Sequence, residues 1–312
     1  MLNRVKNFIS RNKMEYQIFE KEVHRKPKGE KQDYLSMLLL AHSIEKGEGL
    51  PTVRNGYGKE KAEKLLGYLL EYKEDEKSFE LMQAYSVLER YVHFCRENGV
   101  KIENIEKEFG LLSVYYVDNK VQTGVRVLER SALYNGFSLE EASNFLTSRH
   151  SIRDFEKKTV DDETMQQIVR LALSAPSACN RQPVKVYYTY DADKVSRISC
   201  NIEGIRGFED HIPNWALVTA SRDLFRTSEY FQWYMNGGIF LGYLLQAFHA
   251  HQIGSCTFQT PISFPGTTKI RLLMNIPEDE VIIAAVGYGY VHEQVKVLYS
   301  ARRDVEQVLV KR

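Results

Sequence analysis

The chain has 312 residues, 43% of them hydrophobic, which is enough for two domains or for one domain with a large extension. Its 42 lysines and arginines almost balance its 41 aspartates and glutamates, so it lacks the basic field that recruits nucleic acid or anionic lipid. The four cysteines have no C-x-x-C spacing, which argues against a zinc site and a disulfide framework. No apolar run approaches the roughly 20 residues of a membrane span, and no signal-peptide core is present, so we expect a soluble cytoplasmic protein without nucleic-acid, membrane or metal partners.

Helical periodicity dominates the chain from its start to about residue 119. We expect an amphipathic helix in residues 1–22, a polar linker in 24–31 and an apolar central helix in 34–44. Further helices are predicted at 62–70, 79–97, 102–116 and 124–134. Asn135-Gly136 then marks a turn, so we place a domain boundary at 135–138 and expect residues 1–137 to form an all-α accessory region.

Residues 138–312 mix helical and strand patterns. Ser138 and Glu141 form a capping-box pattern that starts a helix ending before Arg149, and Asp161 is a good cap for a helix that Pro176 stops. Strands are predicted at 184–190, 215–221, 253–259 and 281–287, with further helices at 228–251 and 267–274. The second region is therefore expected to be an α+β domain whose central sheet is sandwiched by helices.

Two short stretches of this region carry the most chemistry. Arg149, Ser151 and Arg153 alternate, so in an extended arm their side chains lie on one side and can converge on a phosphate. The loop over 175–183 offers Ser, Asn and Gln donors and acceptors without bulk, which suits a planar polar ligand. Judged from chemistry alone, an alternative to ligand binding remains open: the arginines are solvated and the loop is an ordinary turn.

The arm, the helix after it and the loop Ala175-Pro-Ser-Ala-Cys-Asn-Arg-Gln-Pro183 together resemble the nitroreductase family of FMN-dependent oxidoreductases. The later turn Gly254-Ser-Cys256, the buried strand ending in Gly287-Tyr-Gly289 and the basic residues near the C-terminus extend this resemblance over about 138–310. The N-terminal His-x-Ile-Glu-Lys-Gly and Arg-x-Gly-Tyr-Gly runs resemble the helical extension of some nitroreductase-like proteins associated with surface-polysaccharide gene clusters.

The resemblance implies a role for each matching residue. Contacts to the FMN phosphate and ribityl chain would come from Arg149, Ser151 and Arg153, helped by Arg302 or Arg303. The isoalloxazine would be lined by Pro176, Ser177, Asn180 and Gln182. Gln259 and Thr260 fall where the family places a backbone N–H against flavin N5, and Gln259 is the candidate nearest the reacting atoms. The best-known members carry Glu-Gly at these two positions.

The activity that the resemblance implies is ping-pong hydride transfer from NADH or NADPH, through FMN, to an organic acceptor. The acceptor would be a nitroaromatic, a quinone-like compound or a dedicated metabolite. The resemblance also implies a homodimer with the flavin at its interface, and the small residues Gly237, Gly238, Gly242 and Ala247 suit a helix that packs closely there. The alternative hypothesis is a non-catalytic or accessory flavoprotein that acts through its N-terminal helices.

Overall fold

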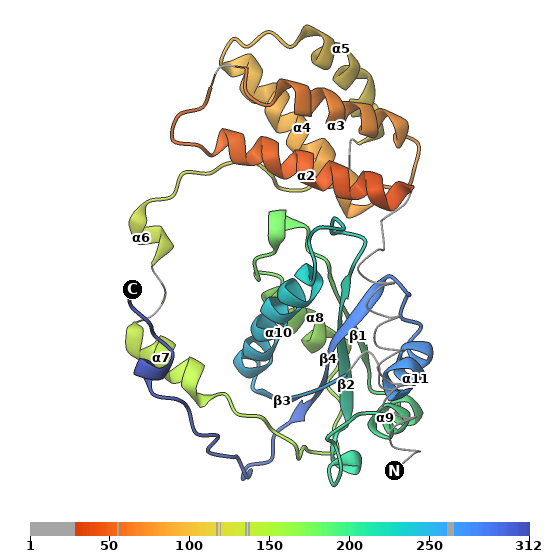
Figure 1. Cartoon of the computed structure of the whole chain (residues 1–312), viewed down its shortest axis with the longest axis vertical. Coiled ribbons are helices and arrows are strands. Elements are labelled where there is room, and N and C mark those ends of the chain that lie inside the picture. Colours follow the sequence, from red (N-terminus) through yellow and green to blue (C-terminus); the bar gives the residue numbers. More distant parts are fainter. Residues whose placement is uncertain are drawn as a thin grey trace. The chain divides into compact units, whose positions relative to one another are not determined.

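A computed structural model of the chain describes residues 29–312 except 55, 117, 119, 135, 137 and 261–264 (Figure 1). The helix predicted for 1–22 and most of the linker predicted for 24–31 lie outside these residues. The chain divides into two compact units, 1–137 with 176–183 and 221–236, and 138–175 with 184–220 and 237–312. The division into an accessory region, 1–137, and an FMN-binding domain, 138–312, stays a prediction.

The first unit is built on a helical core. Its helices are α2 (Glu30–Glu48), α3 (Lys59–Glu71), α4 (Phe79–Glu97) and α5 (Glu103–Leu112), in agreement with the helices predicted there. The side chain of Ser78 accepts a hydrogen bond from the Leu81 N–H and so caps α4. The buried tyrosines of the core include Tyr91, whose hydroxyl donates to the carbonyl of Tyr57 over 2.8 Å. Apolar packing between α2, α3 and α4 therefore accounts for this part of the fold.

The helix predicted at 124–134 is wrong, because only α6 (Arg130–Leu133) is helical there. Gly124 has a left-handed φ of 93°, and its N–H donates to the Glu45 carboxylate over 3.2 Å rather than to a helical carbonyl. The apolar residues that suggested the helix face solvent, and Val127 is 93% exposed. Without a surface to cover, their periodicity does not lead to a longer helix.

A four-stranded sheet forms the centre of the second part of the fold (Figure 1). Its strands are β1 (Val184–Thr189), β2 (Asn214–Ser221), β3 (Ile253–Phe258) and β4 (Glu280–Tyr290), in the order β1-β2-β4-β3. β1 pairs antiparallel with β2, and β3 pairs antiparallel with β4, with Ile253 opposite Tyr290. All four predicted strands are confirmed, and β3 lies at an edge of the sheet.

Helices cover both faces of this sheet, which confirms the predicted α+β sandwich. The covering helices are α8 (Asp162–Ala172), α9 (Ala192–Ser199), α10 (Gln232–Ala250) and α11 (Pro265–Leu273), whereas α7 (Leu139–Ser148) buries no residue. Apolar residues of α8 and α10 pack with Ala216 and Val218 of β2, and those of α9 and α11 pack with the intervening Trp215 and Leu217. The capping box of Ser138 and the Asp161 cap both form as predicted, whereas α9, capped by Asp191, was not predicted.

The close approach of α10 to β4 depends on Gly237, one of the small residues predicted from sequence to pack at a dimer interface. A Cβ at Gly237 would lie 2.5 Å from Cγ1 of Ile283, so any larger side chain here would push the helix off the sheet. Among the described residues, no helix combines the length and the apolarity needed to cross a membrane.

Candidate functional site

The arginine arm runs beside the edge strand β3. The chain becomes extended at Arg149, immediately after α7. The Ile152 N–H donates to the Ser255 carbonyl over 3.0 Å, and Ser151 forms a parallel bridge with Ser255. The Ile152 side chain is buried in the core, so its neighbours Ser151 and Arg153 point to the other side of the arm. One backbone hydrogen bond and one buried side chain thus fix the direction of the arm.

The arm and the C-terminal tail line one pocket of about 330 Å³. Three of its lining residues are the arginines Arg149, Arg153 and Arg302, and none of its lining residues is a carboxylate. Within the described residues, the hydrogen bonds of Arg153 and Arg302 go only to the nearby carbonyls of Ser151 and Ser300. Such an uncompensated group of guanidinium ions is suited to a multiply charged anion. The remaining lining residues are Leu146, Thr147, His150, Ser151, Leu298, Tyr299 and Ser300.

Arg153 also lines a second pocket, of about 370 Å³, at the end of β3. Gln259 lines this pocket and is exposed, while Thr260 is buried and its hydroxyl has no hydrogen-bond partner in the described part of the chain. Burial raises the pKa of the Cys256 thiol in the same pocket, although the charge of Arg153 acts in the opposite direction. Arg153 is therefore the residue that the two pockets share.

The polar loop is held in an unusual backbone conformation. Cys179, Asn180 and Gln182 have φ values of 52°, 53° and 46°, in the left-handed region that residues with a Cβ seldom adopt. The Gln182 N–H donates to the hydroxyl of Ser177 over 3.0 Å. Each such residue costs on the order of 1–3 kcal/mol, and groups of them occur where a backbone is held in place for a ligand.

Arg181 holds the loop and was not among the predicted site residues. It is 3% exposed, and its two terminal nitrogens lie 2.7 and 2.8 Å from the carboxylate oxygens of Glu229. It also donates to the Leu224 carbonyl and lies over the Phe225 ring. Burial alone would raise the pKa of Glu229, but its hydrogen bonds from Arg181 and from the Arg226 N–H outweigh burial and lower it. The partner is 48 residues away in sequence, so no local pattern signals the pair.

The structure brings together only part of the predicted set. Arg149, Ser151, Arg153 and Arg302 line one pocket, whereas Arg303 is exposed and does not line it. Among the loop residues, Ser177 and Gln182 are half-buried, and Pro176 and Asn180 are exposed. No cluster of three or more His, Cys, Asp or Glu side chains able to hold a metal occurs among the described residues.

The structure is thus an α+β sandwich with an arginine-lined pocket beside the edge of its sheet. The nitroreductase family model matches residues 146–203, which include the arm, α8 and the loop. Over 165 residues the chain is 27% identical to a protein of Archaeoglobus fulgidus named "Putative NADH dehydrogenase/NAD(P)H nitroreductase", covering 52% of this chain and 92% of the relative. The resemblance to the nitroreductase family is thereby confirmed for this part of the chain.

The solved structures that match the chain include an FMN-dependent nitroreductase from Clostridium difficile R20291, at 22% identity and a TM-score of 0.47. The match covers 55% of this chain and 99% of that one. A nitroreductase family protein from Clostridium novyi NT is 19% identical, with a TM-score of 0.44, over 50% of this chain and 87% of that one.

Proposed function

We propose that the chain is an FMN-dependent NAD(P)H oxidoreductase. The observation that carries this proposal is the pocket lined by Arg149, Arg153 and Arg302 without any carboxylate. The FMN phosphate is a dianion, and bidentate guanidinium groups are the strongest side-chain partners for phosphate oxygens. The nitroreductase family match over residues 146–203 and the printed name of the Archaeoglobus fulgidus relative support NADH or NADPH as the electron donor.

The loop is the part of the chain that would hold the flavin ring. Ser177, Asn180 and Gln182 supply small polar groups for the pyrimidine edge, and Pro176 supplies an apolar contact for the ring. The left-handed backbone at Cys179, Asn180 and Gln182, fixed through Arg181, orients these groups before the cofactor arrives. The backbone N–H groups near Gln259 and Thr260 are proposed to face flavin N5. Bound FMN supplies the hydride chemistry, and these residues bind it, orient it and exclude water.

The proposed enzyme is a homodimer, with the arm and the loop of one flavin site supplied by different subunits. Support comes from a stripe of exposed apolar side chains on α10, Met235, Ile239 and Tyr243, spaced one helical turn apart. Gly238 and Gly242 lie on the same exposed part of α10, and a Cβ at either position would meet no atom within 4 Å. An exposed apolar stripe with small residues suits close packing of a second protein surface.

The electron acceptor is proposed to be a small organic molecule, either a nitroaromatic or quinone-like compound or a dedicated metabolite. NAD(P)H and acceptor would bind the same flavin face in turn. A protein that binds FMN but is not reduced by NADH or NADPH under anaerobic conditions would instead fit the alternative of a non-catalytic flavoprotein.

The cofactor is tested by purifying the full chain and measuring released FMN by its absorbance and fluorescence. We expect Arg153→Ala to weaken FMN retention about tenfold or more, because a charge-assisted hydrogen bond contributes roughly 1.5–3 kcal/mol. Arg170→Ala is the matched control, since Arg170 is an exposed arginine of α8 that lines neither pocket. Equal FMN content in the two variants would refute the assignment of the arm.

A further inference from the structure

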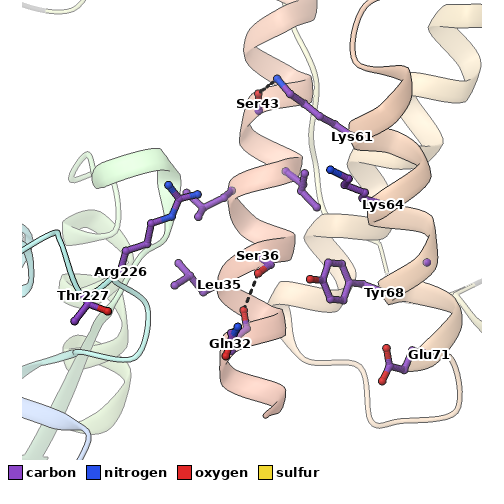
Figure 2. A pocket seen from close by; sticks show the side chains of 13 residues that line it. Gln32, Leu35, Ser36, Ser43, Lys61, Lys64, Tyr68, Glu71, Arg226 and Thr227 are labelled. Carbon is purple, nitrogen blue, oxygen red and sulfur yellow. Dashed lines mark hydrogen bonds between the residues drawn. The ribbon is translucent and has the colours of Figure 1, made fainter. Parts of the chain in front are cut away.

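One pocket of the first unit is an open groove of about 820 Å³ over α2 (Figure 2). One face of α2 forms its floor, α3 forms one wall, and Arg226 with Thr227 forms the other. This volume is in the range of pockets that hold small organic ligands. The α2 residues that line it are Gln32, Leu35, Ser36, Leu39, Leu40 and Ser43, and the α3 residues are Lys61, Lys64, Gly67, Tyr68 and Glu71.

Positive charge predominates along the walls of this groove. Lys61, Lys64 and Arg226 line it, against the single carboxylate of Glu71. Lys61 donates to the Ser43 hydroxyl over 2.6 Å, and within the described part of the chain neither Lys64 nor Arg226 has an ion-pair partner. Figure 2 shows the two lysines on α3 and Arg226 reaching toward α2 from the other wall. Cations on both walls favour an anion between them.

The floor of the groove is apolar. Leu35 is 5% exposed, and Leu39, Leu40 and Tyr68 are half-buried along the same surface. Leucine side chains that remain accessible in a lined groove favour a ligand with an apolar body, because covering them removes apolar surface from water. The lining thus combines an apolar floor with cationic walls.

Gly67 keeps the groove open on the α3 side. It lies inside α3, where glycine is about 1 kcal/mol less favourable than alanine. No close packing explains its presence, since a Cβ at this position would meet no atom within 4 Å. A larger side chain here would project from the wall into the groove, so the glycine leaves space that packing does not require.

The Arg226 wall is fixed by the ion pair that also holds the polar loop. The Arg226 N–H donates over 2.7 Å to a carboxylate oxygen of Glu229, and the same carboxylate is paired with Arg181. The main chain at Arg226 is therefore held in place before any ligand binds, which reduces the ordering cost of binding.

From these features we propose that the groove binds a small organic anion with an apolar body, such as an aromatic or aliphatic carboxylate, sulfonate or phosphate ester. The apolar body covers Leu35, Leu39 and Leu40, and the anionic group lies between Lys64 and Arg226. This site is separate from the proposed flavin pocket, because the two share no lining residue. The proposal does not depend on the proposed function.

The test is a fluorescence titration of the full chain with 8-anilinonaphthalene-1-sulfonate, an aromatic anion, and with its neutral analogue N-phenyl-1-naphthylamine. We expect saturable binding of the sulfonate that weakens about fivefold or more in Lys64→Glu and in Arg226→Gln, because each change removes a charge-assisted contact. Lys107→Glu is the matched control, since Lys107 is an exposed lysine of α5 outside the groove. The neutral analogue should bind more weakly and respond equally to all three variants.

A second pair of variants tests the shape of the groove without changing its charge. Gly67→Phe should abolish sulfonate binding by filling the groove, whereas Gly67→Ala should retain it. Circular dichroism shows whether each variant is folded, and FMN content measured on the same samples reports separately on the flavin proposal. Equal sulfonate affinity in Lys64→Glu and Lys107→Glu, or in Gly67→Phe and Gly67→Ala, would overturn the groove assignment.

Discussion

The arm pocket and the α2 groove are both cationic, but they differ in the kind of cation and in the surface beneath it. The arm pocket gathers three arginines without a carboxylate, whereas the groove has two lysines, one arginine and one glutamate over an apolar floor. Arginine offers a planar fork that matches phosphate oxygens, and lysine offers a hydrated point charge. Local arrangement can thus give two different cationic surfaces, each proposed as an anion site, in a chain with a net charge of only +1.

The largest expected effect comes from removing two arginines of the arm at once. In Arg149→Ala/Arg153→Ala we expect FMN retention to fall about a hundredfold or more, because two charge-assisted bonds of roughly 1.5–3 kcal/mol each are lost. Binding of anilinonaphthalene sulfonate to the groove should not change. Equilibrium dialysis against FMN and the fluorescence titration measure the two sites separately. Parallel losses of FMN binding and sulfonate binding would show that the arm pocket and the α2 groove are not independent sites.

A smaller but substantial effect, on the free energy of unfolding, is expected from replacing Arg181. In Arg181→Ala the partly buried carboxylate of Glu229 loses its ion-pair partner, and three left-handed residues of the loop lose their anchor. We expect the free energy of unfolding to fall by about 2–3 kcal/mol. Urea unfolding measures it, with Arg170→Ala as the exposed control. A change below about 0.5 kcal/mol, the size usual for surface substitutions, would mean that the pair does not hold the loop.

The same pair predicts a dependence of stability on pH. The pKa of Glu229 is lowered in the folded chain from its ordinary value of 4.5, so its contribution is present above that value and is lost as pH falls through the folded pKa. Between about pH 6 and pH 3, a range that brackets ordinary carboxyl pKa values, we expect the free energy of unfolding to fall with decreasing pH. The fall should be less steep in Glu229→Gln than in the unchanged chain. Identical slopes would argue against a lowered pKa.

Local patterns predicted most of the fold. Ser138 and Asp161 could be identified as helix caps because a cap depends on residues only three positions apart. The buried strands were recognisable from their apolar runs. The segment 124–134 was misjudged because its apolar residues are exposed, and burial is a tertiary property that its spacing does not contain.

In the candidate site, too, local patterns predicted some features and missed those that depend on distant residues. Alternation along the sequence predicted that Arg149, Ser151 and Arg153 would share one side of an arm, and they line one pocket. Arg302 and Arg303 are adjacent, so sequence left the choice between them open, and only Arg302 lines the pocket. The α2 groove was missed because its walls come from segments more than 150 residues apart, as with Lys64 and Arg226.

The smallest expected effect is a change in the free energy of unfolding at Gly67, which can be measured separately from ligand binding. Gly67→Ala should raise the free energy of unfolding by about 0.5–1 kcal/mol, because alanine is the better helix former and its Cβ meets open space. The control is Gly110→Ala in α5, where a Cβ also meets open space. Urea unfolding measures both variants, and the control gives the stability change expected for an exposed helical glycine that lines no groove. If both variants gain stability, Gly67 lowers the stability of α3 at a position that lines the groove. A loss of stability in Gly67→Ala alone would mean that the glycine serves the packing of α3, and the argument for an open groove would lose that support.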